Sequence, residues 1–169
     1  MEIRKAALQD LDRVAGLFTE ATCDLNRRGI HMWDELYPDR ACLGEDINHQ
    51  SLYLMEDGGE LAAAFVLEEE IDFTVPVDWQ YDGRSAWICR LCVSAARQNR
   101  GYGRRAMLEA ERLLREQGYE AARLDAFWNH PASLHLYESL GYRRVGEAVF
   151  RKGLFYFYEK ALIDSDARG

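Results

Sequence analysis

The sequence has few of the features that mark membrane, exported or nucleic-acid-binding proteins. No apolar run approaches the roughly 20 residues that a helix needs to cross a bilayer. The start, Met1 to Lys5, lacks the apolar stretch and cleavage site of a signal peptide. Lysine and arginine number 21 against 29 acids, so the net charge of -8 offers no general basic face for nucleic acid. We expect a cytoplasmic protein with no membrane or nucleic-acid partner.

Cysteine is also scarce, and its spacing does not favour a metal site. The chain has four cysteines in apolar surroundings: Cys23, Cys42, Cys89 and Cys92. Without an export signal, buried free thiols are expected. Cys89 and Cys92 form one CxxC pair, but the second pair of a zinc site is missing, so no metal is predicted.

The apolar content of the chain is sufficient for a packed core. Hydrophobic residues make up 48% of the 169 residues and aromatic residues 12%, which excludes a disordered chain. The length suits one domain. We predict a single domain over residues 1–163 and a frayed tail over 164–169.

Charge is unevenly distributed along the chain. Residues 56–82 contain nine acids and no lysine or arginine, whereas residues 97–105 contain four arginines and no acid. The arginines of the second block are Arg97, Arg100, Arg104 and Arg105. An arginine block in an acidic chain predicts an anion site. The alternative is scattered charge on a solvated helix.

Hydrophobic periodicity predicts alternating strands and helices. Strands are expected over 2–6, 51–55, 61–67, 86–93, 121–127, 142–147 and 155–162, and helices over 10–23, 39–48, 101–118 and 132–140. The strand–helix–strand unit at 86–126 predicts an α/β class with a mixed sheet. Along its first strand, Trp87, Cys89, Leu91 and Val93 are expected on one face. The aromatic run 155–158 is expected on a terminal strand that supports a homodimer edge.

The segment from Arg90 to Arg104 is the richest in chemical information. A buried strand is followed by a polar loop and by a turn with Gly101 and Gly103 that opens a helix. Glycines let the backbone approach a ligand, and the first amides of a helix lack internal partners at the positive end of its dipole. This arrangement predicts a phosphate site. The alternative is an ordinary strand-to-helix turn.

A dinucleotide fingerprint is a competing interpretation of the same glycines. Gly101, Gly103 and Ala106 fit G-x-G-x-x-A, and Asp125 lies at the distance of a ribose-binding acid. In that fold, however, the glycines follow the strand almost at once, whereas residues 94–100 intervene here. This disfavours a nicotinamide-binding oxidoreductase.

Two motifs resemble those of the GCN5-related N-acetyltransferase (GNAT) superfamily. Gln98-Asn99-Arg100-Gly101-Tyr102-Gly103 is similar to its Q/R-x-x-G-x-G/A signature, and Leu136 to Tyr142 resembles its L-Y-x-x-x-G-F/Y block. The ending Tyr158 to Leu162 resembles the last strand of the family. The resemblance implies an α/β (α+β) fold with a mixed, mostly antiparallel central sheet of about seven strands and helices on both faces. It also implies acetyl transfer from acetyl-CoA to an amine, without a metal, by direct attack in a ternary complex.

The resemblance assigns donor-binding roles to particular residues. The backbone of Leu91, Cys92 and Val93 would pair with the pantetheine arm. The loop amides that would hold the pyrophosphate belong to Gln98, Asn99, Arg100, Gly101, Tyr102, Gly103 and Arg104. Many family members carry a pantetheine-binding Asn seven residues before the tyrosine of the second block. Here that position is His130, and Asn129 precedes it, so either residue or neither makes this contact.

The catalytic residues are predicted partly by the same resemblance. Tyr137 corresponds to the family tyrosine that protonates the departing CoA thiolate; the alternative is a core aromatic residue. Some members carry a Glu base on the strand equivalent to 86–93, where this chain has Arg90. The candidates for the base are Glu68, Glu69, Glu70, Asp72 and His130, of which Glu69 and Glu70 are assigned as catalytic through an ordered water. Asp125 is expected to be structural, paired with Arg123.

The acidic block is the candidate acceptor site. Its acids are interleaved with aromatic residues, and such rings can hold a cation. We assign acceptor binding to Trp33, Tyr37, Asp72 and Trp79. This predicts a small cationic amine or a peptide N-terminus as acceptor, the alternative being solubility charge on a loop. A non-catalytic acyl-CoA-binding module is the second hypothesis for the whole protein.

Overall fold

The computed structural model describes residues 1–71 and 74–163. Asp72 and the predicted tail 164–169 lie outside the described residues. The chain forms two compact units. Unit 1 comprises Met1–Leu67 and Arg90–Met107, and unit 2 comprises Glu68–Cys89 and Leu108–Gly169. The single domain expected over 1–163 therefore stays a prediction.

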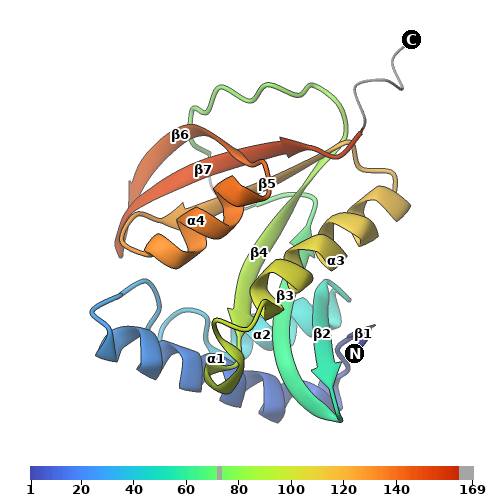
Figure 1. Ribbon diagram of the computed structural model, residues 1–169, viewed down its shortest axis with the longest axis vertical. Helices are drawn as coiled ribbons and strands as arrows, with labels where there is room; N and C mark the ends of the chain where they lie inside the picture. Colours follow the sequence, from blue (N-terminus) through green and yellow to red (C-terminus); the bar gives the residue numbers. More distant parts are fainter. Residues whose placement is uncertain (72–73, 164–169) are drawn as a thin grey trace. The chain divides into compact units, whose positions relative to one another are not determined.

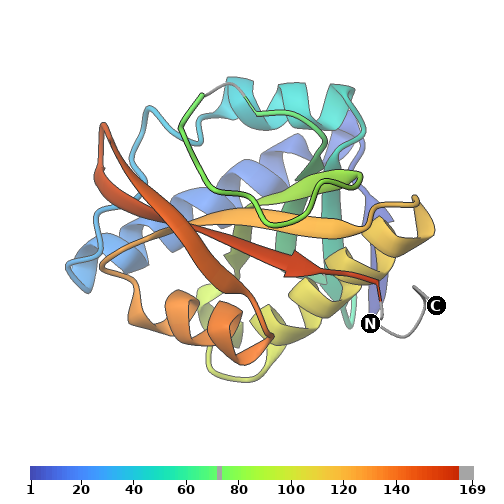
Figure 2. The same ribbon diagram turned by 90° about the horizontal axis from the view of Figure 1, so that it is seen from above.

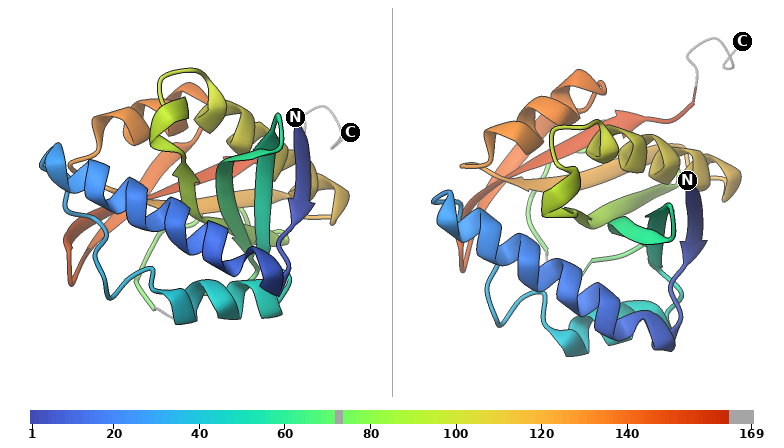
Figure 3. Two further views of the ribbon diagram at one scale, coloured as in Figure 1. Left: turned by 90° about the horizontal axis from the view of Figure 1, so that it is seen from below. Right: turned by 60° about the horizontal axis from the view of Figure 1, so that its bottom comes forward.

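Unit 1 contains three strands and two helices near the start of the chain. They are β1 (Glu2–Lys5), α1 (Leu11–Arg27), α2 (Arg40–Asn48), β2 (Leu52–Asp57) and β3 (Glu60–Glu68), the last of which ends at the border with unit 2. The pairs β1–β2 and β2–β3 are antiparallel, and Gly58 and Gly59 turn the chain between β2 and β3 with φ of 62° and 81°. Helices α1 and α2 pack against each other, in blue and cyan in Figure 3.

The helices of unit 1 follow from local signals. Asp39 caps α2, because its carboxylate accepts a hydrogen bond from the Cys42 amide at 2.8 Å. Helix α1 buries one stripe at helical spacing: Val14, Leu17, Phe18, Ala21 and Leu25. This helix extends to Arg27, beyond the predicted end near residue 23, and the left-handed Gly29 (φ 77°) follows it.

Unit 2 contains the remaining elements, and two of them start or end in unit 1. They are β4 (Ser85–Val93), α3 (Tyr102–Glu116), β5 (Ala121–Phe127), α4 (Pro131–Ser139), β6 (Arg143–Phe150) and β7 (Gly153–Ala161). The first residues of β4 pair with β5 in parallel, whereas β5–β7 and β7–β6 are antiparallel (Figure 1). The strand–helix–strand prediction is therefore confirmed.

The connection from β3 to β4 packs on strands of unit 2. In its described part, residues 69–71 and 74–84, it forms no strand. The amide of Gln80 donates to Glu159 of β7 at 2.7 Å, and the Tyr81 carbonyl accepts from Arg123 of β5 at 3.1 Å. Figure 2 shows this segment in green, passing over the strands of the unit.

The strand order is β1-β2-β3-β4-β5-β7-β6. This confirms the predicted mixed, mostly antiparallel sheet of seven strands. The expected dimer edge at residues 155–158 is wrong, because β7 lies between β5 and β6 and both of its edges are already paired.

Strand β4 departs from the predicted alternation. Arg90 has φ of 49°, in the left-handed region that strands do not use, so the side-chain register changes there. Trp87, Ile88 and Cys92 are buried, whereas Leu91 and Val93 are partly exposed. The expected single face of Trp87, Cys89, Leu91 and Val93 is therefore wrong.

The four cysteines are thiols rather than disulfides, as predicted, but they are not all buried. Cys92 is buried, Cys42 and Cys89 are partly exposed and Cys23 is exposed. Among the described residues, no helix combines the length and the apolar character required to span a membrane.

Candidate functional site

The glycine turn of unit 1 opens helix α3 with exposed backbone. Asn99 and Gly101 are left-handed, with φ of 57° and 82°. The amide of Arg105 makes the first intrahelical bond, to the Gly101 carbonyl at 3.1 Å, so the amides of Tyr102 and Gly103 precede the helical ladder. A Cβ built on Gly101 meets no atom within 4 Å, which leaves open space beside the turn. This helix start fits an anionic phosphate group.

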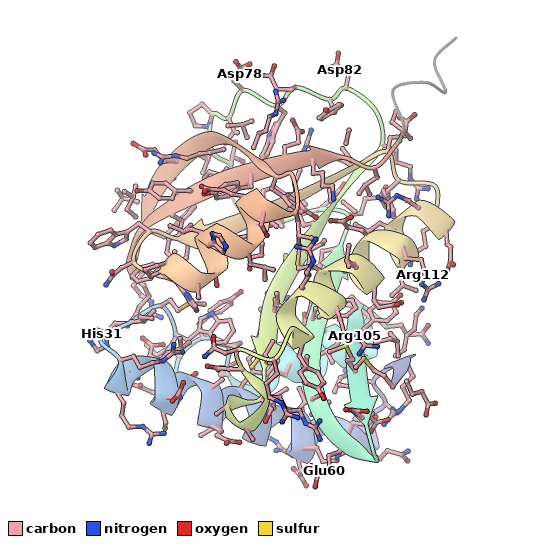
Figure 4. All side chains as sticks on the ribbon, viewed as in Figure 1. His31, Glu60, Asp78, Asp82, Arg105 and Arg112 are labelled. Carbon is pink, nitrogen blue, oxygen red and sulfur yellow. The ribbon has the colours of Figure 1, made fainter. Side chains whose placement is uncertain are left out.

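The four arginines of the predicted anion patch have different roles. Arg97 donates to Asp57 and to Glu60, each at 3.1 Å, and its side chain is only 16% exposed. Arg100, Arg104 and Arg105 are exposed, and Figure 4 shows Arg105 on α3. The acidic and basic blocks of the sequence therefore meet within unit 1, at Arg97.

The residues at the end of β4 and just after it make hydrogen bonds within unit 1. The Cys92 thiol points to the Leu17 carbonyl (Sγ–O 3.9 Å), and burial raises its pKa, so it is not a thiolate near neutral pH. The Ser94 amide bonds the Ala62 carbonyl of β3 at 2.9 Å. The Gln98 amide group reaches the Val93 carbonyl at 3.4 Å. The Cys92 side chain is therefore buried and protonated, and the role predicted for this residue is a backbone one.

Trp33 and Tyr37 differ in exposure and in the partners of their side chains. Trp33 is buried against Phe18, with ring centroids 5.3 Å apart, and belongs to the core of unit 1. Tyr37 is 41% exposed, and its hydroxyl accepts a hydrogen bond from Arg90 at 2.8 Å. Arg90 also donates two bonds to Asp46, at 2.9 and 2.7 Å.

Tyr137 of α4 is a buried tyrosine near charged and sulfur-bearing side chains of unit 2. Its pKa is raised above the ordinary value of 10, first by burial and then by the charge of Asp125, while a hydrogen bond with Ser133 opposes the rise. Cys89 of β4 raises this pKa further. A tyrosine with a raised pKa keeps its proton at neutral pH and can act as an acid.

Glu68, rather than Glu69 or Glu70, lies beside this group. Its Oε2 accepts a hydrogen bond from the Cys89 thiol, with 3.7 Å between the heavy atoms. Glu69 is 3.5 Å from Arg84 in an exposed ion pair, and Glu70 is exposed. Sequence reasoning placed Glu68 among the candidates, but the spacing of three consecutive acids gave no means of choosing it.

Trp79 is already covered by a cation of the protein. The Arg123 guanidinium lies 4.2 Å from its ring centroid, and its ring packs edge-on against Trp87 at 5.4 Å. Arg123 pairs with Glu159 at 3.0 Å, and the expected Arg123–Asp125 pair stays a prediction. Two residues apart on one strand, the side chains share a face, but Glu159 stands directly opposite Arg123 on β7.

His130 and Asn129 occupy different environments. His130 caps α4, because its Nδ1 accepts a hydrogen bond from the Ser133 amide at 3.3 Å. Asn129 is exposed just before this cap. Within residues 1–71 and 74–163, no group of three or more His, Cys, Asp or Glu side chains could hold a metal ion.

Comparisons with known proteins identify the family and the fold of the chain. The acetyltransferase (GNAT) family profile matches residues 14–142, which is more than half of the chain. Curated protein sequences give no match. A GNAT-family acetyltransferase from Streptococcus agalactiae has 23% identity and a TM-score of 0.79, with 95% of this chain and 94% of that one covered.

Two further solved structures share the fold. The ribosomal-protein-S18-alanine N-acetyltransferase of Escherichia coli has 15% identity and a TM-score of 0.74, covering 97% of this chain and 95% of its own. The PaiA N-acetyltransferase of Thermoplasma acidophilum, in complex with coenzyme A, has 18% identity and a TM-score of 0.71, covering 95% and 98%. The chain belongs to the GNAT acetyltransferase family and is an acyltransferase that uses acetyl-CoA.

Proposed function

We propose that this protein acetylates a primary amine by direct attack on acetyl-CoA in a ternary complex. The observation that carries the proposal is the buried Tyr137, which keeps its proton at neutral pH and lies near Cys89 and Asp125. A donor loop at the start of α3 supports it, because its amides and glycines suit a pyrophosphate.

The donor is held by backbone groups in this proposal. The amides of residues 98–104 bind the pyrophosphate, and the backbone of 91–93 pairs with the pantetheine arm. His130 already caps α4, so Asn129 is the side chain that we assign to the pantetheine. Acetyl-CoA supplies the activated acetyl group for transfer.

Tyr137 acts as the general acid. As the amine nitrogen bonds the acetyl carbon and the carbon–sulfur bond breaks, Tyr137 donates its hydroxyl proton to the sulfur. Burial and the Asp125 charge both favour the protonated phenol, so the proton is present for transfer to the sulfur.

Glu68 is the proposed acceptor of the amine proton, through an ordered water. The support is its hydrogen bond with Cys89, a side chain that also interacts with Tyr137. Glu69 is engaged with Arg84, which makes it a weaker candidate than the sequence suggested.

The proposed acceptor is a small cationic amine or a peptide N-terminus. Glu70, Asp78 and Asp82 leave exposed negative charge in unit 2, and Figure 4 shows the two aspartates projecting from the connection before β4. The rings of Trp79 and Tyr37 lie against arginines, so carboxylates rather than aromatic faces would attract the amine. The similarity to an enzyme named for a protein alanine keeps the peptide class open.

The acid role is tested by replacing Tyr137 with Phe. We expect kcat to fall by about 10² to 10⁴-fold with little change in the Kd for CoA. Because the folded pKa lies above 10, wild-type kcat should show no loss from this group below pH 10; the loss comes as pH rises through the folded pKa. Unchanged kcat in the variant would remove Tyr137 from the mechanism.

The base role is tested by three matched variants. Glu68→Gln is expected to lower kcat/KM for the amine by about 10 to 100-fold. Glu69→Gln and Glu70→Gln are the controls and should stay within about twofold. An effect confined to a control would reassign the base.

A non-catalytic acyl-CoA-binding module remains the competing function. CoA release is measured with acetyl-CoA and a panel of polyamines, amino acids and peptides. Amine-dependent release supports the enzyme. Tight CoA binding without release from any of these acceptors supports the module, and a preference for acidic acceptors contradicts the proposed acceptor class.

A further inference from the structure

One carboxylate of unit 1 anchors residues 98–101, the first part of the donor-binding segment 98–104, at both ends. Arg97 precedes residues 98–101 and Tyr102 follows them. The Tyr102 hydroxyl donates to Asp57 Oδ2 at 2.6 Å, and Arg97 Nη1 donates to the same oxygen at 3.1 Å. Asp57 ends strand β2, at the turn into β3. One carboxylate oxygen, 40 residues from Arg97 and 45 from Tyr102 in sequence, therefore joins both ends of residues 98–101.

The contacts at this point reinforce one another. Arg97 Nη1 also donates to the Tyr102 hydroxyl at 2.9 Å, which closes a three-membered network. Arg97 Nη2 donates to the Asp57 carbonyl at 3.3 Å. The hydrogen bond from Tyr102 and the charges of Arg97 and Arg105 lower the pKa of Asp57, so it is ionised near neutral pH. Charge-assisted bonds of this kind are stronger than neutral ones.

The loop between these anchors has an uncommon backbone. Asn99 and Gly101 are both left-handed, at φ of 57° and 82°. Asparagine and glycine are the residues that adopt this region most readily, so the turn is set locally. The network fixes the two ends of that turn, because its anchors flank residues 98–101.

We propose that Asp57 is a positioning residue for the donor, which fixes the loop so that its amides face the pyrophosphate of acetyl-CoA. The inference rests on the proposed role of residues 98–104 in binding that group. Arg97 then acts through Asp57 and Tyr102, not by touching the phosphates.

A purely structural role for Asp57 makes a different prediction. Loss of stability alone would weaken every ligand alike, or none when the protein is folded. Loss of positioning weakens only ligands with a pyrophosphate. S-acetylpantetheine carries the thioester and the pantetheine arm without the pyrophosphate, so it separates the two roles.

The experiment compares Asp57→Ala, Asp57→Asn and wild type with two donors. Asp57→Ala is expected to raise the Kd for CoA and the KM for acetyl-CoA by about tenfold. The kcat at saturation and the KM for S-acetylpantetheine should stay within about twofold. Asp57→Asn keeps an acceptor oxygen for Tyr102 and should lie between wild type and Asp57→Ala.

Glu60→Gln is the matched control. Glu60 also accepts a hydrogen bond from Arg97, but its side chain is 80% exposed. The oxygen that joins Arg97 to Tyr102 belongs to Asp57. Its Kd for CoA should change less than twofold. Thermal unfolding of each variant establishes that it is folded at the assay temperature.

Tyr102→Phe completes a double-mutant cycle. If Asp57 acts through Tyr102, the double variant binds CoA about as weakly as Asp57→Ala alone. Equal losses with acetyl-CoA and S-acetylpantetheine, or an unchanged Kd for CoA in folded Asp57→Ala, would overturn the inference while leaving the proposed function intact. Wild-type protein that fails to bind CoA would overturn both.

Discussion

Arg90 of unit 1 and Arg123 of unit 2 have the same kinds of partner in different backbone settings. Each pairs with a buried carboxylate and lies beside an aromatic residue. Arg123 sits in regular strand β5, directly opposite Glu159. Arg90 sits where β4 has φ of 49°, and Asp46 reaches it from helix α2.

The difference predicts that the Arg123 pair is structural and that the Arg90 pair shapes the proposed donor site. Glu159 is 1% exposed and also accepts the Gln80 amide, so the Arg123 pair ties a loop to a continuous ladder. The Arg90 pair instead restrains the point where the backbone of β4 is left-handed. This point lies immediately before residues 91–93, which we assign to the pantetheine. The role of an arginine–carboxylate pair therefore depends on the backbone conformation at the arginine.

The largest expected effect is from Glu159→Ala. It leaves the largely buried Arg123 without its carboxylate and the Gln80 amide without its acceptor, which together cost about 3–5 kcal/mol in the free energy of unfolding. Urea denaturation measures the loss. Glu147→Ala is the control, because the exposed Arg144–Glu147 pair should contribute less than about 1 kcal/mol. A loss below 1 kcal/mol for Glu159→Ala would contradict the structural role.

Asp46→Asn should cost less stability and more function. We expect about 2 kcal/mol, since Arg90 keeps the Tyr37 hydroxyl as a partner. The KM for S-acetylpantetheine should rise several-fold, because the strand end that follows Arg90 loses its restraint. If KM is unchanged while the protein is destabilised, the Arg90 pair is as structural as the Arg123 pair.

Acid titration sharpens the comparison through a third arginine, Arg4. Its hydrogen bond lowers the pKa of Asp10 to about 2, from an ordinary value near 3.8. Stability from this pair is therefore fully present above pH 4 and is lost as pH falls toward 2. The thermal midpoint of wild type should fall over that window, and Asp10→Asn should show a smaller fall. Parallel curves would exclude a contribution from Asp10.

The smallest expected effect is from Tyr37→Phe. It removes one acceptor of Arg90 at an exposed ring, so we expect about 1 kcal/mol or less. In an Asp46→Asn background the loss should grow, because Arg90 then lacks the carboxylate charge and depends more on the Tyr37 hydroxyl. Additive losses in urea denaturation would show that the two partners act independently.

Local features were largely predictable from the sequence. Strand β5 has the predicted bounds of 121–127, because apolar alternation between turn residues is a strong strand signal. The helix start at residue 101 and the break at Gly118 follow from glycine chemistry. The bounds of these elements depend on residues that are close in sequence, so the sequence alone predicts them.

Contacts between distant residues were not predictable. The left-handed Arg90 carries no sequence signal, since it is neither glycine nor asparagine. The choice of Glu68 over Glu69 depends on Cys89, and the burial of Trp33 depends on Phe18. Charge counts correctly showed an acidic and an arginine block but not that Asp57 and Arg97 join them.

Gly101 separates what folding requires from what binding requires. Gly101 has φ of 82°, and an added Cβ would meet no atom within 4 Å. The fold therefore requires a left-handed backbone at this position but not a small side chain. Asparagine, which tolerates this region, should therefore preserve folding better than valine. Any loss of CoA affinity in a well-folded Gly101→Asn variant would then report how closely the ligand approaches the main chain.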